Sequence, residues 1–340
     1  MFGPRAVVAL SAVAFVRNMN ASATTAAPEV PGLLRLHAVR GCEVRRCNEM
    51  LLLRPGGDSP TSGRHVLYFP GDIQNFHEVM ASHHDNRQWL PWSLENVAVK
   101  LSKHFPGSHV WVIRASRMYL HKFSCYDNFV ESSLFGAPEH SSGYGAFRHL
   151  QALFVHAFEL AKNPLDSVGI NGSAACAGAS NSCYESQKSS SCNQPFVMNS
   201  SLPANLTLTL VGFSKGCVVL NQLLYELAGA RANSMTSSFV KHITDMYWLD
   251  GGHPGGSDTW VTKTEVLKEL ASSGIAVHCH VTPYEVRDPM RAWVGNEHSK
   301  FAQTLKELGA PIVNVVHFMN EKPSLENHFR VLEMISNEEV

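Results

Sequence analysis

Residues 206–228 read LTLTLVGFSKGCVVLNQLLYELA, and this stretch decides the fold. An apolar strand over 206–211 passes directly into Gly212-Phe213-Ser214-Lys215-Gly216 and then into a helix over 217–228. The pattern Gly-x-Ser-x-Gly arises easily by chance, and a tight strand-to-helix turn without chemistry would give the same string. Its place between a strand and a helix is nevertheless where a nucleophile elbow must lie. Such a turn lifts the Ser214 hydroxyl above the end of a sheet and leaves the Lys215 N–H beside it.

The pattern on both sides of this stretch alternates between strands and helices. Apolar runs predict strands at 65–69, 109–113, 246–249, 275–281 and 312–318, and helical spacing predicts helices at 94–105, 147–161, 261–270, 301–308 and 325–335. Strands separated by helices of this length form a mainly parallel sheet with helices on both faces. The sequence therefore predicts an α/β fold that is α/β-hydrolase-like.

Two segments differ in character from the rest of the predicted domain. Residues 164–204 are rich in Ser, Asn, Gly, Ala and Cys without periodicity, which predicts a disordered surface insertion. Residues 118–138 are aromatic and irregular, and we expect them to supply any cover over the substrate. We expect residues 1–42 to be a targeting segment and linker, and residues 43–340 to form one domain.

A serine nucleophile needs a base and an orienting acid, which follow the serine in the order Asp, His in this fold. His328 lies between the last predicted strand and the final helix, and Asp288 is held in a loop by Pro289 after the preceding strand. We favour Asp288 as the acid, although it could instead only cap a helix. Asp250, at the end of the strand over 246–249, is the alternative acid.

An oxyanion at this site would need two backbone donors. One is the Lys215 N–H at the start of the helix, and the second is expected from the loop after the strand at 65–69, where Gly71 lets an N–H turn inward. Asp72 is a difficulty, because its carboxylate would repel the oxyanion unless it points away or pairs with Lys215.

Composition excludes several classes of protein. With 28 basic and 29 acidic residues among 340, the net charge of −1 gives no basis for nucleic-acid binding. No apolar run reaches the ~18–20 residues that span a bilayer. The chain has no Cys-x-x-Cys pair, so we expect neither a structural zinc site nor another metal or cofactor.

The N-terminus has the composition of a targeting segment. The first 28 residues hold Arg5 and Arg17, no acid, and an apolar run over 6–16. Both a secretory signal and a mitochondrial presequence fit this composition, and an ordinary first helix of the fold is the third alternative.

Several longer blocks resemble one family. They are Tyr68-Phe69-Pro70-Gly71-Asp72, the runs at 92–97, 121–129 and 212–224, Tyr247-Trp248-Leu249-Asp250-Gly251-Gly252-His253, and Glu326-Asn327-His328-Phe329-Arg330. Together they resemble the vertebrate chromosome 2 open reading frame 69 family over about 64–333. The resemblance implies an α/β-hydrolase-like protein without a settled substrate, with a link to respiratory-chain upkeep. It also favours mitochondrial targeting, to the matrix, over secretion.

The sequence thus predicts a serine hydrolase of ester, thioester or amide bonds with the triad Ser214, Asp288 and His328. Its substrate would be a small molecule or an acyl compound. The alternative is a catalytically silent, hydrolase-like binding protein that acts through a mitochondrial partner, because a fold alone does not establish activity.

Overall fold

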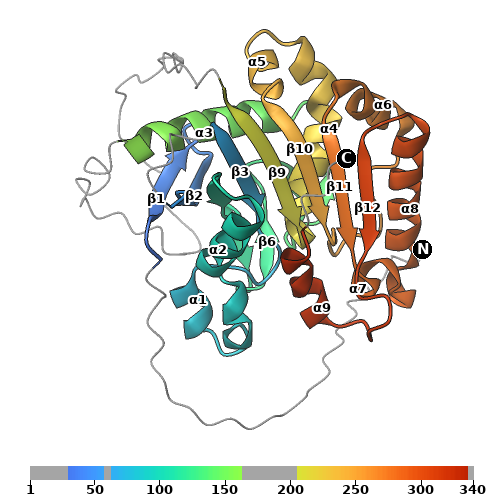
Figure 1. Cartoon of the computed structure of the whole chain (residues 1–340), viewed down its shortest axis with the longest axis horizontal. Coiled ribbons are helices and arrows are strands. Elements are labelled where there is room, and N and C mark those ends of the chain that lie inside the picture. The colour runs from blue at the N-terminus through green and yellow to red at the C-terminus, as the bar shows by residue number, and fades with distance from the viewer. Residues whose placement is uncertain (1–29, 57–62, 163–204, 336–340) are drawn as a thin grey trace, which may run out of the picture.

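One sheet of eight strands organises the part of the chain that this computed structural model describes, residues 30–56, 63–162 and 205–335 (Figure 1). Across the sheet the order is β1-β2-β4-β3-β9-β10-β11-β12. β2 runs antiparallel to both of its neighbours, and every other pair is parallel. This arrangement confirms the predicted α/β-hydrolase-like fold. The strands are β1 (Leu33–Arg40), β2 (Cys47–Leu53), β3 (Arg64–Phe69), β4 (His109–Ile113), β9 (Thr207–Phe213), β10 (Ile243–Leu249), β11 (Ala276–Val281) and β12 (Ile312–Val316).

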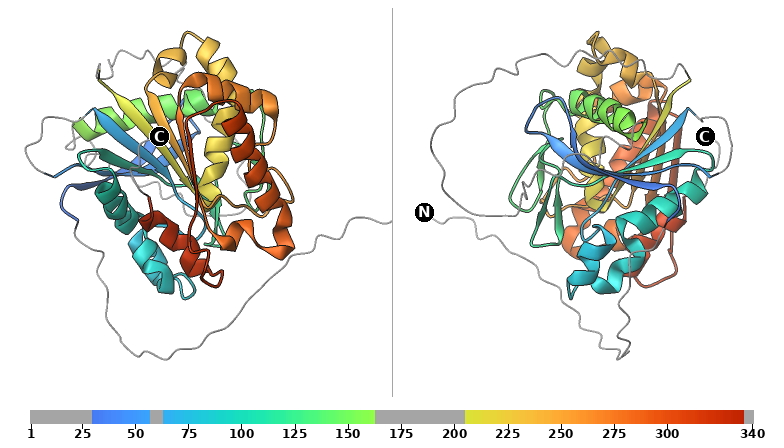
Figure 2. Two further views of the ribbon diagram at one scale, coloured as in Figure 1. Left: turned by 45° about the vertical axis from the view of Figure 1, so that its right-hand side comes forward. Right: turned by 90° about the vertical axis from the view of Figure 1, so that its left-hand side faces the viewer.

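Helices cover both faces of this sheet, as Figure 2 shows from two sides. One face packs against α3 (Ala146–Lys162), α4 (Cys217–Ala232), α6 (Thr264–Ser273) and α8 (Ala292–Glu307), and the other packs against α2 (Leu94–His104) and α9 (Leu325–Arg330). Side chains of β9 alternate between the two cores, since Leu208 and Leu210 face the first and Val211 and Phe213 the second. The strand is therefore apolar on both sides, as a central strand of a parallel sheet must be. The described ranges also contain three short helices, α1 (His77–Ser82), α5 (Ser237–Val240) and α7 (Pro283–Val286).

The parallel strands place the candidate residues at one edge of the sheet. β3, β9, β10, β11 and β12 all end on the same side, so the loops that follow them meet there (Figure 1). In open α/β sheets ligands bind at this carboxyl edge. Ser214 and Asp250 lie at this edge, because they directly follow β9 and β10. The segment that leads from β12 to α9 starts at the same edge.

The fold begins earlier than the expected boundary at residue 43. β1 lies before that boundary and pairs with β2 along the edge of the sheet. A register shift between Leu36 and Val39, with Ala38 at a φ of +48°, interrupts the alternation of apolar residues. Because a bulge breaks the period of two, the sequence pattern of this strand is weak.

The aromatic segment that we expected to be irregular forms two small antiparallel sheets. They are built from β5 (Arg117–Tyr119) with β6 (Phe123–Cys125), and β7 (Glu131–Ser132) with β8 (Pro138–Glu139). The helix predicted at 301–308 is also longer than expected, since α8 begins at Ala292. Residues 295–300 of this helix read Gly-Asn-Glu-His-Ser-Lys, and this run without apolar residues interrupts the helical pattern before Phe301.

Some expectations concern residues that lie outside the described ranges. These are the targeting segment over most of 1–42 and the insertion at 164–204. Within the described ranges, no helix is both long and apolar enough to cross a membrane.

The end of β3 packs tightly against the turn between β9 and α4, at Gly216. A Cβ atom at this position would lie 1.9 Å from the carbonyl oxygen of Phe69, the last residue of β3. The obstacle is backbone, so neither element can move without displacing the centre of the sheet. Gly229, on the exposed side of α4, has nothing within 4 Å of the same position.

Replacing these two glycines by alanine should therefore have opposite effects. Gly216→Ala should lower the free energy of unfolding by ~3 kcal/mol, the upper part of the range for overpacking. Gly229→Ala should raise it by about 0.5–1 kcal/mol, because alanine is the better helix former. Denaturant unfolding of both variants measures the difference, and equal losses would contradict the close approach at Gly216.

Candidate functional site

The turn after β9 has the geometry of a nucleophile elbow. Ser214 has a φ of +50°, a value that is unfavourable for a residue with a side chain. The N–H of Gly252 donates to the Ser214 carbonyl at 3.3 Å, which helps to hold the residue in this conformation. A Cβ on Gly71 would lie only 2.8 Å from Cβ of Ser214, so the loop after β3 packs directly on the serine. Ser214 is 8% exposed.

The structure brings His328 to this turn. The imidazole lies on the ring of Phe213, the residue before the serine, with 4.7 Å between ring centroids, and Tyr284 contacts it at 5.0 Å. α9 begins at an N-cap, Ser324, whose hydroxyl accepts from the Asn327 N–H, and this start fixes the position of the first turn. His328 is 4% exposed.

Asp250 orients this histidine. Its Oδ2 accepts a hydrogen bond from Nδ1 of His328 at 2.7 Å. The same carboxylate accepts the N–H and the hydroxyl of Thr282, each at 2.7 Å, and it is fully buried. The sequence had offered Asp250 only as the alternative acid. With Nδ1 engaged, Nε2 is the nitrogen left for a reacting group.

Asp288, the acid that we favoured, does not reach His328. Its carboxylate accepts the N–H of Met290 at 2.9 Å and Nε of Arg291 at 2.8 Å, which caps the short helix at Pro289–Arg291. Burial raises its pKa, but the hydrogen bonds from Arg291 and Met290 outweigh this and hold the pKa below its ordinary value. The expectation was wrong because the chain turns into α7 directly after β11, which carries Asp288 to the surface.

A second buried acid near the histidine was missed. Glu285 is 4% exposed and pairs with Nη1 of Arg291 at 3.0 Å, and its carboxylate lies 2.7 Å from where a Cβ on Gly252 would be. Burial raises its pKa to about 7, against the opposing charges of His328 and Arg291. Asp288 is therefore joined to the site only indirectly, through Arg291 and Glu285. No sequence motif marks Glu285, which follows Pro283 in a helix of four residues.

One of the two expected oxyanion donors is already engaged. The Gly71 N–H donates to Oε1 of Gln74 at 2.8 Å, and that oxygen also accepts the hydroxyl of Tyr68 at 2.7 Å. The expectation for Gly71 as a donor was therefore wrong. The Lys215 N–H lies in the first turn after β9, where a helix has no acceptor of its own to offer.

No hydrogen bond joins Ser214 to His328. Among the described residues neither Oγ of Ser214 nor Nε2 of His328 has a hydrogen-bond partner. Catalytic hydrogen bonds are often long before substrate binds. The ranges that the structure describes also contain no group of three or more His, Cys, Asp or Glu side chains arranged to hold a metal ion.

Comparison with known proteins places the chain in a family. A model of the C2orf69 family matches residues 35–311. The chain belongs to the C2orf69 family. The match confirms the resemblance seen in the sequence blocks, and it begins inside β1.

Relatives of this C2orf69-family chain are similar over most of their length. The human mitochondrial protein C2orf69 is 50% identical over 331 residues, which cover 88% of this chain and 86% of the relative. The mitochondrial protein C2orf69 homolog of Danio rerio is 51% identical over 347 residues, which cover 97% and 94%. The relatives are thus named as mitochondrial proteins.

Solved structures with some similarity to this C2orf69-family chain carry names of hydrolases. XC6422 of Xanthomonas campestris, described as an α/β serine hydrolase without lid, has a TM-score of 0.38 at 13% identity and covers 90% of this chain and 94% of its own. An esterase of Thermogutta terrifontis has a TM-score of 0.39 at 10% identity and covers 90% and 91%.

Replacing Asp250 by alanine should destabilise this C2orf69-family chain more than replacing Asp288. Asp250→Ala leaves the Thr282 N–H and hydroxyl and the His328 Nδ1–H buried without an acceptor, so it should lower the free energy of unfolding by about 3 kcal/mol or more. Asp288→Ala removes a half-exposed helix cap and should cost about 1 kcal/mol. Chemical denaturation of both variants checks the order, and a larger loss from Asp288→Ala would contradict it.

Proposed function

We propose that the chain is a serine hydrolase that cleaves an ester, thioester or amide bond. The observation that carries the proposal is the buried 2.7 Å contact between Nδ1 of His328 and Oδ2 of Asp250, beside a serine with a φ of +50°. A nucleophile, an acid and a base in this chain order and at this edge of the sheet are what acyl transfer on such a fold requires. The similarity to solved hydrolases is too distant to add to this argument.

Each residue has one task in the proposed reaction. Nε2 of His328 takes the proton from Ser214 as Oγ attacks the substrate carbonyl carbon. The same nitrogen then gives that proton to the leaving group, and an acyl-serine remains. His328 then takes a proton from water, whose oxygen attacks the acyl carbon. The bond from that carbon to Oγ breaks, the carboxylic acid product leaves, and the proton on Nε2 returns to Ser214. Asp250 stays ionised, holds the tautomer with Nδ1 protonated, and stabilises the imidazolium that forms.

The Lys215 N–H and the Asp72 N–H are the proposed oxyanion donors. Asp72 takes the place of Gly71, whose N–H is bound to Gln74. The Gly71 carbonyl accepts the hydroxyl of Ser124 at 2.8 Å. Because C=O and N–H point in opposite directions across a trans peptide, the Asp72 N–H points away from Ser124. This N–H has no acceptor among the described residues, and the loop that carries it packs on Ser214.

One observation favours the alternative, a binding protein with a silent site. Ser214 and His328 are 8% and 4% exposed, so a substrate has little direct access to them in this conformation. A protein that uses the scaffold to hold a mitochondrial partner would need no such access. A probe that reacts with the serine separates the two functions.

Labelling with a fluorophosphonate probe tests the proposed triad. Wild-type protein should gain one adduct on Ser214, and Ser214→Ala should gain none. His328→Ala and Asp250→Asn should slow labelling by at least ~10³-fold, since loss of the acid from a triad costs on the order of 10⁴ in rate. Peptide mass mapping and time courses on the intact protein give both quantities.

Asp288→Asn is the matched control for this experiment, and we expect it to label within about threefold of wild type, because Asp288 does not contact the histidine. Absence of any Ser214 adduct on folded wild-type protein would favour the binding function. Equal losses from Asp250→Asn and Asp288→Asn would remove Asp250 from its proposed role.

We also propose a location in the mitochondrial matrix, because the relatives are named mitochondrial proteins. The family resemblance adds a role in upkeep of the respiratory chain, exerted through the unidentified substrate or through a protein partner. Secretion is the alternative location that the N-terminal composition allows.

The pairing of β1 with β2 argues against removal of a presequence by cleavage within or after β1. Cleavage inside β1 would take an edge strand from the sheet and expose the backbone of β2. Protein recovered from mitochondria should therefore begin between residues 18 and 32, as N-terminal peptide mass spectrometry can show. A start after residue 40, or glycan at Asn205 on protein from the medium, would contradict this prediction.

A further inference from the structure

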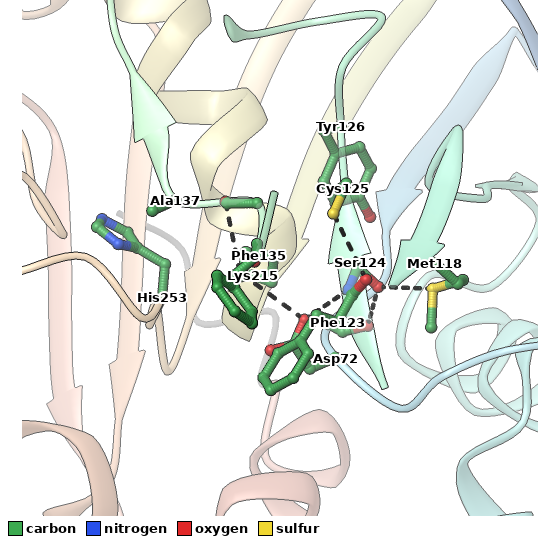
Figure 3. A network of polar contacts seen from close by, with 12 residues as sticks. Asp72, Met118, Phe123, Ser124, Cys125, Tyr126, Phe135, Ala137, Lys215 and His253 are labelled. Atoms are coloured by element: carbon green, nitrogen blue, oxygen red, sulfur yellow. Dashed lines mark hydrogen bonds and ion pairs between the residues drawn. The ribbon is translucent and has the colours of Figure 1, made fainter. Parts of the chain in front are cut away.

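The side chain of Lys215 is fully buried. It lies between the turn at Ser214 and the two small antiparallel sheets, which we call the β5–β6 and β7–β8 hairpins. Its ammonium donates to the carbonyl oxygen of Phe135 at 2.9 Å and to that of Gly136 at 3.4 Å. Oδ1 of Asp72 lies 4.0 Å from the same nitrogen (Figure 3). Burying an ammonium group costs free energy unless it is paired and hydrogen-bonded, so these three partners are needed to stabilise it.

The carboxylate of Asp72 is held on its other side by β6. Its Oδ1 accepts the backbone N–H of Ser124 at 2.8 Å, and the Ser124 hydroxyl donates to the Gly71 carbonyl at 2.8 Å (Figure 3). Ser124 is 1% exposed. One residue of the hairpin thus contacts both the side chain and the backbone of the loop after β3.

The rest of that loop is fixed by neighbouring residues of the same hairpin. The Tyr126 hydroxyl donates to the Pro70 carbonyl at 2.6 Å, and the Ile73 N–H donates to the Lys122 carbonyl at 2.7 Å. Since a peptide group is planar, fixing these carbonyls also fixes the directions of the N–H groups between them.

Gly136 lets the lysine reach these partners. Its φ is +75°, and a Cβ there would lie 2.6 Å from the Ser124 carbonyl and 3.3 Å from the Lys215 ammonium. A larger residue would separate the hairpins from the elbow. The ammonium therefore contacts the backbone between β7 and β8 directly, and it reaches β6 and the loop after β3 through the Asp72 carboxylate.

We propose that the buried Lys215 side chain, paired with Asp72, is a positioning group that clamps the hairpins and the 70–73 loop onto the elbow and so fixes the two oxyanion amides. The inference rests on the proposed function in one respect only, which is that these amides serve an oxyanion. Lys215 has two separate tasks in this scheme. Its backbone N–H faces the reacting atoms, and its side chain acts through Asp72.

The charge of the ammonium has a purpose that packing alone would not need. A free carboxylate beside the oxyanion site would oppose the negative charge that develops there. Burial lowers the pKa of Lys215 and raises that of Asp72, and each partner offsets the effect on the other. The pair thus lets Asp72 anchor the loop without acting as a free negative charge.

Lys215→Met tests the clamp, since it keeps the backbone N–H and the length of the side chain but removes the charge. Two properties are measured in the full chain, amide hydrogen exchange and the rate of fluorophosphonate labelling. Lys268→Met, at an exposed position on α6, is the matched control and should change neither.

In Lys215→Met, exchange at the Ser124 and Gly136 amides should be about 10-fold faster or more. Labelling should slow by about 10-fold or more, a part of the ~10²–10³-fold that loss of an oxyanion donor costs. Adding Asp72→Asn to this variant should recover several-fold of the labelling rate, because it removes the unpaired carboxylate. A lysine that served packing alone would show no such recovery at temperatures where all variants are folded.

Ser124→Ala is the second variant, for the case in which Lys215→Met does not fold. It removes only the hydroxyl that binds the Gly71 carbonyl. Like Lys215→Met, it should slow labelling, and it should speed hydrogen exchange at the Ile73 amide. Unchanged exchange in the folded variants would overturn the clamp whether or not the wild type reacts. Faster exchange with unchanged labelling of a reactive wild type would overturn the link to the oxyanion amides. A wild type that does not react would count against the proposed function instead, and exchange alone would then decide on the clamp.

Discussion

The structure of the site depends on one buried contact, the hydrogen bond from Nδ1 of His328 to Oδ2 of Asp250. It joins residues 78 positions apart, one in the last helix and one at the end of a central strand. A buried carboxylate is tolerated only when donors surround it, and Thr282 supplies two of these at 2.7 Å. The contact therefore fixes α9 to the carboxyl edge of the sheet, and it selects which histidine nitrogen remains free.

The chain is strained where two neighbouring strands end. Ser214 follows β9 and Asp250 follows β10, and their φ angles are +50° and +46°. Each strained residue is held by the backbone of an adjacent segment, since the Gly252 N–H donates to the Ser214 carbonyl and the Asp250 N–H donates to the His280 carbonyl. Such conformations persist only where the surroundings determine them, and they concentrate at functional sites. The sheet thus supplies the rigidity, and the loops supply the chemical groups.

The sequence predicted the parallel strands and the turn at Ser214 because both depend on neighbouring residues. Apolar runs and the glycines around Ser214 are local signals, and His328 follows from the order of the elements. The choice between Asp250 and Asp288 depends on where α9 packs, which no local pattern encodes, and the capping signal of Asp288 before Pro289 describes its actual role. Neither β1 nor β2 was predicted, and in β1 a bulge breaks the alternation. The engagement of the Gly71 N–H by Gln74 is a tertiary contact that the motif does not reveal.

The Asp250–His328 contact can be measured directly by nuclear magnetic resonance of protein with isotope-labelled histidine. The account predicts a slowly exchanging proton on Nδ1 of His328, assigned by its absence in His328→Gln. This signal should persist in Asp288→Asn and be lost or strongly shifted in Asp250→Asn. A His328 ring protonated only at Nε2, or a signal that responds to Asp288→Asn and not to Asp250→Asn, would contradict the central claim that Asp250 orients this base.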